Sequence, residues 1–409
     1  MTDASKTGKT VAAAPRSTAR DEQARALSVP AAPRESGGRK PRLLFVGAFP
    51  PPGHKVYGGF VTDCKALMAS SLPGRLELDL LDSTQISNPP PGFLRRLLLA
   101  VRRLARYLRK LVFGRPDAVL LFASSGGSLM EKGLMAWAAR LLGKPALLFP
   151  RSGAIMDQFR ASRKRRFAIT LAFGGARAIL CQGPAWQDFA VDELGYAASD
   201  AIVVPNWTAS ADLIGIGLDR PPASSRAGRI LYLGWLEEKK GVLDLIRAFA
   251  DLPWDEPILD MVGDGNARDR AESLARELGV AERVVFHGWK AGTARDELLA
   301  AADIFVLPSW AEGLPNAMIE AMAARLPIIV TPVGTIGSYI SDGENGLLVV
   351  PRSVSSLAAA LRRLVEDDAL RQKLADAAFR MAQEEFSVEI AADRLAAAVG
   401  RYARHPAAS

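Results

Sequence analysis

Residues 301–332 read AADIFVLPSWAEGLPNAMIEAMAARLPIIVTP, and this stretch decides the fold class of the chain. Two short apolar runs, bounded by proline and glycine, flank a segment with helical spacing. Strand, helix and strand in this order form the repeating unit of a parallel sheet. Pro315 fits the first turn of the helix, where a missing N–H group costs nothing. We therefore predict strands at 304–307 and 328–331 and a helix that begins near Pro315.

Two glutamates mark this helix, Glu312 at its mouth and Glu320 about one and a half turns inside it. The loop that opens the helix offers free backbone N–H groups at Gly313, Leu314 and Asn316, beside the positive end of the helix dipole. Such a loop favours an anionic or hydroxyl-rich ligand at the carboxyl end of the sheet. On spacing alone, the two glutamates also fit a helix cap and a solvated helix face.

The composition describes a globular chain of 409 residues, 49% hydrophobic and 23% charged, which is long enough for two domains. The two cysteines, Cys64 and Cys181, lie in apolar segments and are expected to be buried thiols in a reducing compartment. The three histidines are far apart and no Cys/His pairs occur at ligand spacing, so we expect no structural zinc site.

Residues 1–40 consist largely of Ala, Ser, Thr, Pro, Arg and Lys, a composition that cannot form a core, and we expect a disordered tail. This segment lacks the apolar region of a secretory signal. No later run of about 18 apolar residues suggests a membrane span. We therefore expect a cytoplasmic protein.

The net charge of +8 is concentrated in the first half of the chain. Residues 93–115 contain many basic side chains and no acid, with Leu and Val at helical intervals, and 160–166 form a second basic cluster. A basic amphipathic helix is typical of a segment that lies on an anionic membrane surface. A solvated surface helix and a nucleic-acid patch are the alternatives. Few aromatics and no recognised nucleic-acid module accompany the charge, so we expect no nucleic-acid partner.

The first half opens with an apolar strand at 42–47, a long loop that contains Gly58 and Gly59, and a helix at about 60–70. Strand, glycine-rich loop and helix form the first turn of a Rossmann-like domain. The two glycines allow close approach of a ligand to the backbone. Their spacing is not that of the dinucleotide fingerprint, and a simple flexible connection is the alternative.

Alternation of strands and helices continues along both halves of the chain. In the first half we predict further strands at 76–81, 118–122, 146–150, 178–181 and 201–204, and helices at 93–112, 127–142, 156–172 and 184–194. A Pro- and Ser-rich stretch at 220–228 follows, and the pattern restarts. In the second half we predict further strands at 230–234, 258–262, 284–286 and 346–350, and helices at 242–252, 357–366, 369–384 and 388–404.

Several short motifs occur in a fixed order along 229–350. They are Gly234, Lys240-Gly241, Gly263-Asp264-Gly265, Phe286-His287-Gly288, Leu307-Pro308-Ser309, Glu312, Glu320, Gly334 and Asp342-Gly343-Glu344-Asn345-Gly346. In this order and spacing the chain resembles the GT-B glycosyltransferases, specifically the retaining, sugar-nucleotide-dependent enzymes of family four. The resemblance extends over nearly all of residues 41–404.

The resemblance implies an α/β fold with two Rossmann-like domains facing across a cleft and a C-terminal helix that crosses back to the first domain. We expect five segments: a tail at 1–40, an acceptor domain at 41–205, a linker at 206–228, a nucleotide-sugar domain at 229–385, and the crossing helix and tail at 386–409.

The same resemblance implies roles for individual residues. Glu320 binds the ribose hydroxyls, because a carboxylate accepts two hydrogen bonds. Glu312 and Lys240 are the expected catalytic residues, with Lys240 stabilising the charge that grows on the diphosphate. The expected donor-binding residues are Gly58, Gly59, Gly234, Lys239, Gly313, Leu314, Pro315, Asn316 and Glu320. We expect neither a metal nor a cofactor beyond the nucleoside diphosphate sugar that serves as donor.

The chain departs from the family pattern at two places. Trp235 stands where relatives usually carry Arg, so Lys239 is expected to supply the second cation. Many relatives carry a His before a Gly at the end of a first-domain strand, where this chain has Pro150-Arg-Ser-Gly153. Arg151 or Ser152 is expected to replace that His on the acceptor or sugar side. His287 is expected to be a structural turn residue, because no paired acid or nucleophile is near it in sequence.

We therefore predict a retaining, metal-independent glycosyltransferase that moves a sugar from a nucleoside diphosphate sugar to a hydroxyl acceptor. The basic segment suggests a lipid-linked saccharide at the inner membrane face, as in surface polysaccharide assembly. A nucleotide-sugar epimerase, a phosphorylase and a non-catalytic sugar-nucleotide-binding protein are the alternatives.

Overall fold

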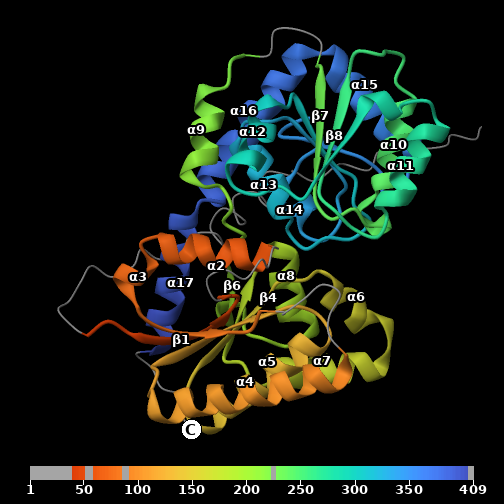
Figure 1. Ribbon diagram of the computed structural model, residues 1–409. Coiled ribbons are helices and arrows are strands. Elements are labelled where there is room, and N and C mark those ends of the chain that lie inside the picture. The colour runs from red at the N-terminus through yellow and green to blue at the C-terminus, as the bar shows by residue number, and fades with distance from the viewer. Residues whose placement is uncertain (1–38, 51–58, 85–91, 223–226, 404–409) are drawn as a thin grey trace, which may run out of the picture. The chain divides into compact units, whose positions relative to one another are not determined.

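The computed structural model describes residues 39–50, 59–84, 92–222 and 227–403 (Figure 1). The predicted tail, except for residues 39 and 40, and the predicted donor-binding residue Gly58 lie outside this described part. Two six-stranded sheets, each with only parallel pairings, form the centres of an N-lobe and a C-lobe. The two parallel sheets agree with the predicted α/β class.

The N-lobe sheet has the strand order β2-β1-β3-β4-β5-β6. Its strands are β1 (Arg42–Gly47), β2 (Glu77–Asp82), β3 (Ala118–Ala123), β4 (Ala146–Pro150), β5 (Ala178–Cys181) and β6 (Ala201–Val203). β3, β4 and β5 are buried along their whole length, which explains their continuous apolar sequences, since a parallel sheet is covered on both faces.

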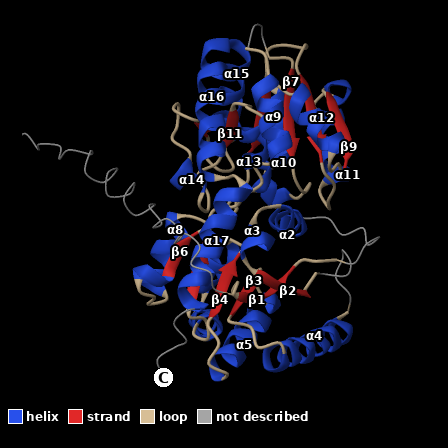
Figure 2. Ribbon diagram, turned by 90° about the vertical axis from the view of Figure 1, so that its left-hand side faces the viewer, coloured by secondary structure: helices blue, strands red, loops and turns tan. Residues whose placement is uncertain are grey.

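Two helical layers cover this sheet, because successive residues of each strand point to opposite faces. One face packs against α2 (Gly59–Ala69), α3 (Leu72–Arg75) and α17 (Val388–Ala403). The other packs against α4 (Phe93–Phe113), α5 (Gly127–Leu141), α6 (Ala154–Ala161), α7 (Arg163–Phe173) and α8 (Pro184–Asp188). Figure 2 shows α4 and α5 on one side of the sheet, and α2, α3 and α17 on the other.

The C-lobe sheet has the order β12-β11-β10-β7-β8-β9. Its strands are β7 (Arg229–Leu233), β8 (Ile258–Val262), β9 (Val284–Gly288), β10 (Ile304–Leu307), β11 (Ile328–Val330) and β12 (Leu347–Leu348). Its helices are α9 (Ala211–Asp219), α10 (Val242–Ala250), α11 (Arg268–Glu277), α12 (Thr293–Ala301), α13 (Asn316–Ala323), α14 (Ile336–Tyr339), α15 (Val354–Glu366) and α16 (Asp368–Glu385).

Helix α17 leaves the C-lobe after α16 and packs on the N-lobe. Its buried residues include Leu395 and Val399, which join the same core as β1, β3 and α2. This is the crossing C-terminal helix that the family resemblance implied, and its presence is confirmed.

Some boundaries differ from the sequence prediction. The helix expected at 156–172 is two helices, α6 and α7, because Ser162 is extended and caps α7 by accepting from the N–H of Arg165. The helix expected at 184–194 continues after α8 as a π-helix at 189–193. Part of the expected linker forms α9, which packs against α12 and α13. Pro315 precedes the first residue of α13 instead of lying in its first turn.

Both cysteines are buried free thiols, as predicted. Burial raises the pKa of the Cys64 thiol to about 12 and also raises that of Cys181. In the described residues, no helix has both the length and the apolar composition needed to cross a bilayer.

Candidate active site

The strand order of the C-lobe sheet determines where its ligand loops meet. From β7 the chain continues to β8 and β9 in one direction, and then returns to add β10, β11 and β12 on the other side of β7. The order therefore reverses between β7 and β10, which pair in parallel. A crevice at the carboxyl ends of such strands is the usual ligand site of an open α/β sheet. The loops at 234–241 and 308–315 leave these two strand ends.

These two loops bring the predicted catalytic residues together. Lys240 Nζ lies 2.6 Å from Glu312 Oε1, which also accepts a hydrogen bond of 2.8 Å from the hydroxyl of Ser309. Gly241 has φ of 71°, which a residue with a side chain rarely adopts, and it turns the chain from the Lys240 turn into α10. The side chains of Lys240 and Glu312 are 18% and 9% exposed, so their attraction is screened less than that of a surface pair.

Glu320 lies in α13 and is largely buried. Its Oε1 accepts a hydrogen bond of 2.9 Å from Arg295 Nη1, at the start of α12. Burial raises the pKa of Glu320 from its ordinary value of 4.5 to about 7, and the charge of Arg295 opposes that rise. Arg295 could not be predicted from the sequence, since no motif marks it and its contact joins two separate helices, α12 and α13.

The loop between Glu312 and α13 is held through its carbonyl oxygens. The carbonyl of Gly313 accepts from the N–H and the hydroxyl of Thr335, and that of Leu314 accepts from the Asn206 side chain. In the described part of the chain, the N–H groups of Gly313 and Leu314 donate to no protein acceptor. The loop therefore has fixed carbonyls, and the binding of a ligand by the N–H groups of Gly313 and Leu314 stays a prediction.

The side chain of Asn316 has contacts that the sequence did not predict. Its side-chain amide donates to Asp63 Oδ1 at 2.8 Å and its side-chain oxygen accepts from Asn206 at 2.7 Å. A Cβ on the predicted donor-binding residue Gly59 would lie 3.0 Å from the amide nitrogen of Asn316. The contacts of Asn316 therefore join the loop at 312–315, here called the donor loop, to α2 and to the segment after β6 in the N-lobe.

Arg151 is enclosed, although the sequence analysis placed it on the acceptor or sugar side. Its side chain is 2% exposed and forms an ion pair with Asp63, whose side chain is 1% exposed. Its guanidinium carbon lies 4.8 Å from the ring centroids of both Phe149 and Trp207. Burial raises the pKa of Asp63, and Arg151 opposes that rise. In this structure Arg151 holds Asp63, which in turn accepts from Asn316, and it has little surface left for a substrate.

The residues after Arg151 pack against the donor loop. Ser152 is half-buried, and its carbonyl accepts from the N–H of Ile155. A Cβ on Gly153 would lie 2.0 Å from the carbonyl oxygen of Glu312, so only glycine fits this contact. The segment that replaces the His–Gly of the relatives therefore positions the loop of Glu312.

The expected second cation, Lys239, is 63% exposed and pairs with Glu237 at 2.8 Å, whereas Lys240 faces Glu312. Trp235 lies against Trp289, with ring centroids 4.9 Å apart, and both are half-buried.

Two further motif residues have contacts within the C-lobe. His287 has an acid partner that its sequence neighbours did not reveal, because its Nε2 lies 2.7 Å from Asp260 Oδ1 in β8. The N–H of Gly234 donates to the carbonyl of Val262 and is therefore not free. No three His, Cys, Asp or Glu side chains of the described ranges lie together as metal ligands.

Comparisons with known proteins find similarity to glycosyltransferases. A family model described as "Glycosyl transferases group 1" matches residues 220–381. The lipopolysaccharide core biosynthesis glycosyltransferase LpsE of Rhizobium meliloti (strain 1021) is 29% identical over 318 residues, which are 76% of this chain and 88% of LpsE. Other relatives match over smaller shares of their length; the putative teichuronic acid biosynthesis glycosyltransferase TuaC of Bacillus subtilis (strain 168) is 36% identical, over 38% of each chain.

Solved structures show the same fold at low sequence identity. The Anabaena protein Alr3699/HepE, in complex with UDP and glucose, has a TM-score of 0.64 and 21% identity, covering 87% of this chain and 98% of its own. Sucrose-phosphate synthase from Thermosynechococcus elongatus has a TM-score of 0.66 and 20% identity, covering 86% and 96%. These likenesses concern the fold.

Proposed function

Since this chain is a group 1 glycosyltransferase of the GT-B fold, we propose that it transfers a sugar from a nucleoside diphosphate sugar to a hydroxyl acceptor with retention of the anomeric configuration. The observation that carries the proposal is the contact between Lys240 and Glu312, beside a loop in which the N–H groups of Gly313 and Leu314 have no acceptor among the described residues. The solved relative HepE was obtained with UDP and glucose, which supports a nucleoside diphosphate sugar as donor.

We assign donor binding and stabilisation of the leaving group to different residues. Glu320, buried in α13, accepts hydrogen bonds from the ribose hydroxyls of the nucleotide. The free N–H groups of Gly313 and Leu314 and the carboxylate of Glu312 hold the donor sugar. As the bond between the anomeric carbon and the diphosphate oxygen breaks, its electron pair stays on the diphosphate. Lys240 and the N-terminus of α13 stabilise that charge. The acceptor oxygen then bonds to the anomeric carbon on the face that the diphosphate leaves, and the proton of the acceptor hydroxyl passes to the departing diphosphate oxygen.

We propose that this transfer needs no metal, because Lys240 and the helix N-terminus meet the charge of the leaving group. The experiment compares turnover in a metal chelator with turnover in added Mg²⁺ or Mn²⁺. Equal rates support the proposal, and a rate that depends on added metal contradicts it.

The donor and the stereochemistry are tested together. A panel of nucleoside diphosphate sugars is screened by thermal shift, because a ligand that binds only the native state raises the melting temperature. The best donor is then incubated with hydroxyl acceptors, and the product is examined by proton NMR. A product with the donor's anomeric configuration supports retaining transfer, and an inverted product contradicts it. A new sugar nucleotide formed without acceptor would instead identify an epimerase.

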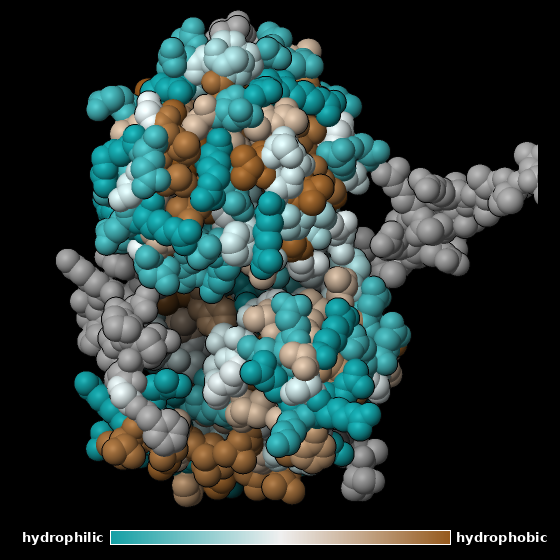
Figure 3. All heavy atoms as spheres, turned by 90° about the vertical axis from the view of Figure 1, so that its right-hand side faces the viewer, coloured by the Kyte–Doolittle hydropathy of each residue, from teal (hydrophilic) through white to brown (hydrophobic). Residues whose placement is uncertain are grey.

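The outer surface of α4 supports a lipid-linked acceptor at a membrane. Apolar side chains recur every three or four residues on one exposed face: Leu94, Leu97, Leu98, Val101, Leu108 and Val112. Exposed arginines flank this face: Arg95, Arg102, Arg106 and Arg109. Figure 3 shows hydrophobic residues along the lower edge of the view, where α4 runs in Figure 1. We propose that this apolar and basic face lies on the anionic inner face of the membrane, where the lipid-linked saccharide is available.

Three exposed arginines of α4, Arg102, Arg106 and Arg109, are suitable for the membrane test. Arg103 pairs with Glu131 at 2.6 Å and is excluded, since its loss would disturb packing between α4 and α5. The variant Arg102→Glu/Arg106→Glu/Arg109→Glu is compared with wild type in sedimentation with phosphatidylglycerol vesicles. We expect binding to fall on the order of tenfold or more, because each cation contributes about 1 kcal/mol near an anionic surface.

The matched control places the same charge change on the C-lobe, with the exposed residues Arg270, Arg276 and Arg380 changed to Glu. This control is expected to sediment with vesicles as wild type does, apart from a general charge effect. Equal sedimentation of the α4 variant and the control would end the membrane proposal without affecting the proposal for donor transfer.

A further inference from the structure

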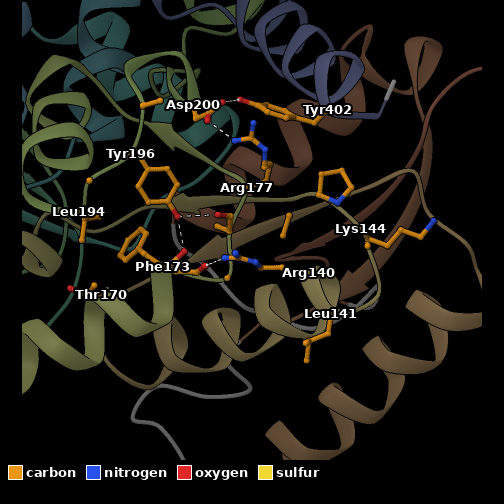
Figure 4. Close-up of a pocket in the computed structure, with 18 of the residues that line it drawn as sticks. Arg140, Leu141, Lys144, Thr170, Phe173, Arg177, Leu194, Tyr196, Asp200 and Tyr402 are labelled. Carbon is orange, nitrogen blue, oxygen red and sulfur yellow. Dashed lines mark hydrogen bonds and ion pairs between the residues drawn. The ribbon is translucent and has the colours of Figure 1, made fainter. Parts of the chain in front are cut away.

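A large cavity lies at the edge of the N-lobe sheet opposite to the donor loops. Its wall includes Lys144 just before β4, Arg177 just before β5 and Asp200 just before β6, so it opens at the amino ends of these strands. The end of α5, the end of α7 and the end of α17 complete the wall, and the cavity volume is about 1160 Å³ (Figure 4). Nothing in the proposed transfer reaction uses this edge, because donor loops leave the carboxyl ends of the strands.

The cavity has an excess of positive charge. Four cationic side chains line it, Arg140, Lys144, Arg177 and Arg401, against one carboxylate, that of Asp200. They come from three segments of the chain, the end of α5 with the turn after it, the residue before β5 and the end of α17. They remain accessible: the side chains of Arg177 and Arg401 are 49% and 48% exposed. Convergence of several cations from different elements on one cavity favours an anionic ligand.

The arginines are fixed in position by contacts that leave donors free. Arg140 donates to the carbonyl of Gly174 at 2.7 Å, Arg177 pairs with Asp200, and Arg401 donates to the carbonyl of Ser199 at 2.6 Å. In Figure 4 the head groups of Arg140 and Arg177 point toward the aromatic residues of the cavity, and Lys144 extends away on the other side. A guanidinium has five N–H donors, and these contacts use only part of them. The groups are therefore held in place before any ligand arrives.

The single carboxylate is compensated by its neighbours. Asp200 accepts a hydrogen bond of 2.7 Å from the hydroxyl of Tyr402 and also pairs with Arg177. Arg401 also lies 3.7 Å from Asp200, so this negative charge is engaged, while Arg140 and Lys144 have no acid partner among the described residues. Apolar surface lies beside the cations, from the half-buried Tyr196 and from Leu141, which is 82% exposed at the end of α5.

We propose that this cavity binds a phosphate-bearing ligand, with the phosphate held by Arg140, Arg177 and Arg401 and the rest of the ligand lying against Tyr196 and Leu141. Arginine suits a phosphate because its planar group donates two parallel hydrogen bonds to oxygens. The volume exceeds that of a phosphate ion, which favours a ligand with an organic part. The phosphate can come from a phospholipid headgroup or from a soluble phosphate compound, and the experiment distinguishes the two.

The first arm measures binding of inorganic pyrophosphate to the full chain by calorimetry. Donor-loop binding is removed separately with Lys240→Gln, so the two sites can be told apart. The variant Arg140→Gln/Arg401→Gln is expected to weaken pyrophosphate binding at the cavity by tenfold or more while donor turnover stays within twofold of wild type. The control Arg270→Gln/Arg276→Gln, with the same change of net charge on α11, is expected to bind as wild type does.

The second arm uses phosphatidylglycerol vesicles with the same variants. Loss of vesicle binding in Arg140→Gln/Arg401→Gln, with competition by pyrophosphate, identifies a lipid headgroup as the source. Loss of pyrophosphate binding with unchanged vesicle binding identifies a soluble compound. Unchanged binding of both probes overturns the proposal.

If the double variant has a lowered melting temperature, the single variant Arg401→Gln gives the same readouts, because this side chain is 48% exposed and its loss disturbs little packing. Arg401→Gln is expected to weaken pyrophosphate binding at the cavity severalfold, and binding equal to wild type in a folded Arg401→Gln protein likewise overturns the proposal. Donor turnover in the same samples reports on the transfer reaction independently.

Discussion

Each lobe has an ion pair at the carboxyl ends of its strands, and the two pairs differ in how exposed they are to a ligand. At the C-lobe edge, Lys240 and Glu312 pair across two loops and remain 18% and 9% exposed. At the N-lobe edge, Arg151 and Asp63 pair at 2% and 1% exposure, against Phe149 and Trp207. The first pair can exchange its contacts for those of a ligand. Arg151 and Asp63 cannot do so without leaving a buried charge unpaired. Their role is to hold the loop that carries Glu312, through the contact of Asp63 with Asn316.

The largest effect is expected from breaking the enclosed pair. Asp63→Ala leaves the guanidinium of Arg151 buried and unpaired and should lower the free energy of unfolding by about 3–5 kcal/mol. Chemical denaturation measures this loss. Asp63→Ala/Arg151→Met removes both charges and is the matched variant, expected to recover most of the stability. Equal instability of the single and double variants would show that the pair itself is not what stabilises the N-lobe edge.

The exposed pair should affect turnover more than stability. Lys240→Ala removes the cation beside Glu312 and is expected to reduce kcat for sugar transfer by roughly 10²–10³-fold, the range found when one stabilising donor is removed from a developing negative charge. Steady-state kinetics with the best donor gives the value. A Lys240→Ala protein that remains folded and turns over within a few fold of wild type would remove the catalytic assignment of Lys240.

Glu320 lies between these two cases, because it is buried like Asp63 and yet expected to bind the donor. Its folded-state pKa of about 7 is above its ordinary value of 4.5, so the protonated form favours folding. The contribution of protonated Glu320 to the free energy of unfolding is fully present below pH 4.5. It is lost as the pH rises to 7, a change on the order of 3 kcal/mol.

The test compares unfolding of Glu320→Gln and wild type across this range. Relative to Glu320→Gln, wild type should lose stability as the pH rises from 4.5 to 7. The carboxylate should meanwhile bind ribose hydroxyls best above pH 7, so the KM for donor in wild type should fall as the pH rises through 7. A parallel KM profile in Glu320→Gln would argue against Glu320 as the ribose ligand.

The smallest effect is expected at Lys239, next to Lys240 in the same turn. Its side chain is 63% exposed and pairs with Glu237, and a surface pair of this kind contributes about 0–1 kcal/mol. Lys239→Ala should therefore change kcat and KM by less than about threefold on that energy scale. A loss as large as that of Lys240→Ala would restore Lys239 as the second cation at the diphosphate.

Much of the fold could be read from local patterns. The strands at 258–262 and 304–307 agree with β8 and β10 at both ends, because a buried parallel strand is a short apolar run between loop residues. The break at Ser162 was missed, since apolar residues continue with helical spacing on both sides and the cap depends on one extended residue. Helix α12 was not predicted, because its nine residues are short for a periodic signal.

The candidate site was predictable only where its residues belong to a recognised sequence motif. Glu312, Gly313, Leu314 and Glu320 follow each other in sequence, and the helix geometry places them together. The partner residues Arg295, Asp63 and Asn206 come from elements far away in the chain and carry no local signal. Arg151 was expected to face a substrate because its position in the chain matched a family residue, but the aromatic residues around it enclose it.

The order of apolar runs was enough to indicate two parallel sheets. The glycines and glutamates indicated the donor loop, and the spacing of basic and apolar residues indicated the basic face of α4. Each of these features depends on residues that are close together in sequence. Which charges face a ligand and which are buried as supports was decided by packing between elements distant in sequence, and so was the cationic cavity at the amino edge of the N-lobe sheet. The physical reason is that the exposure and pairing of a charge depend on the side chains that surround it in space, and the linear sequence contains no direct record of these.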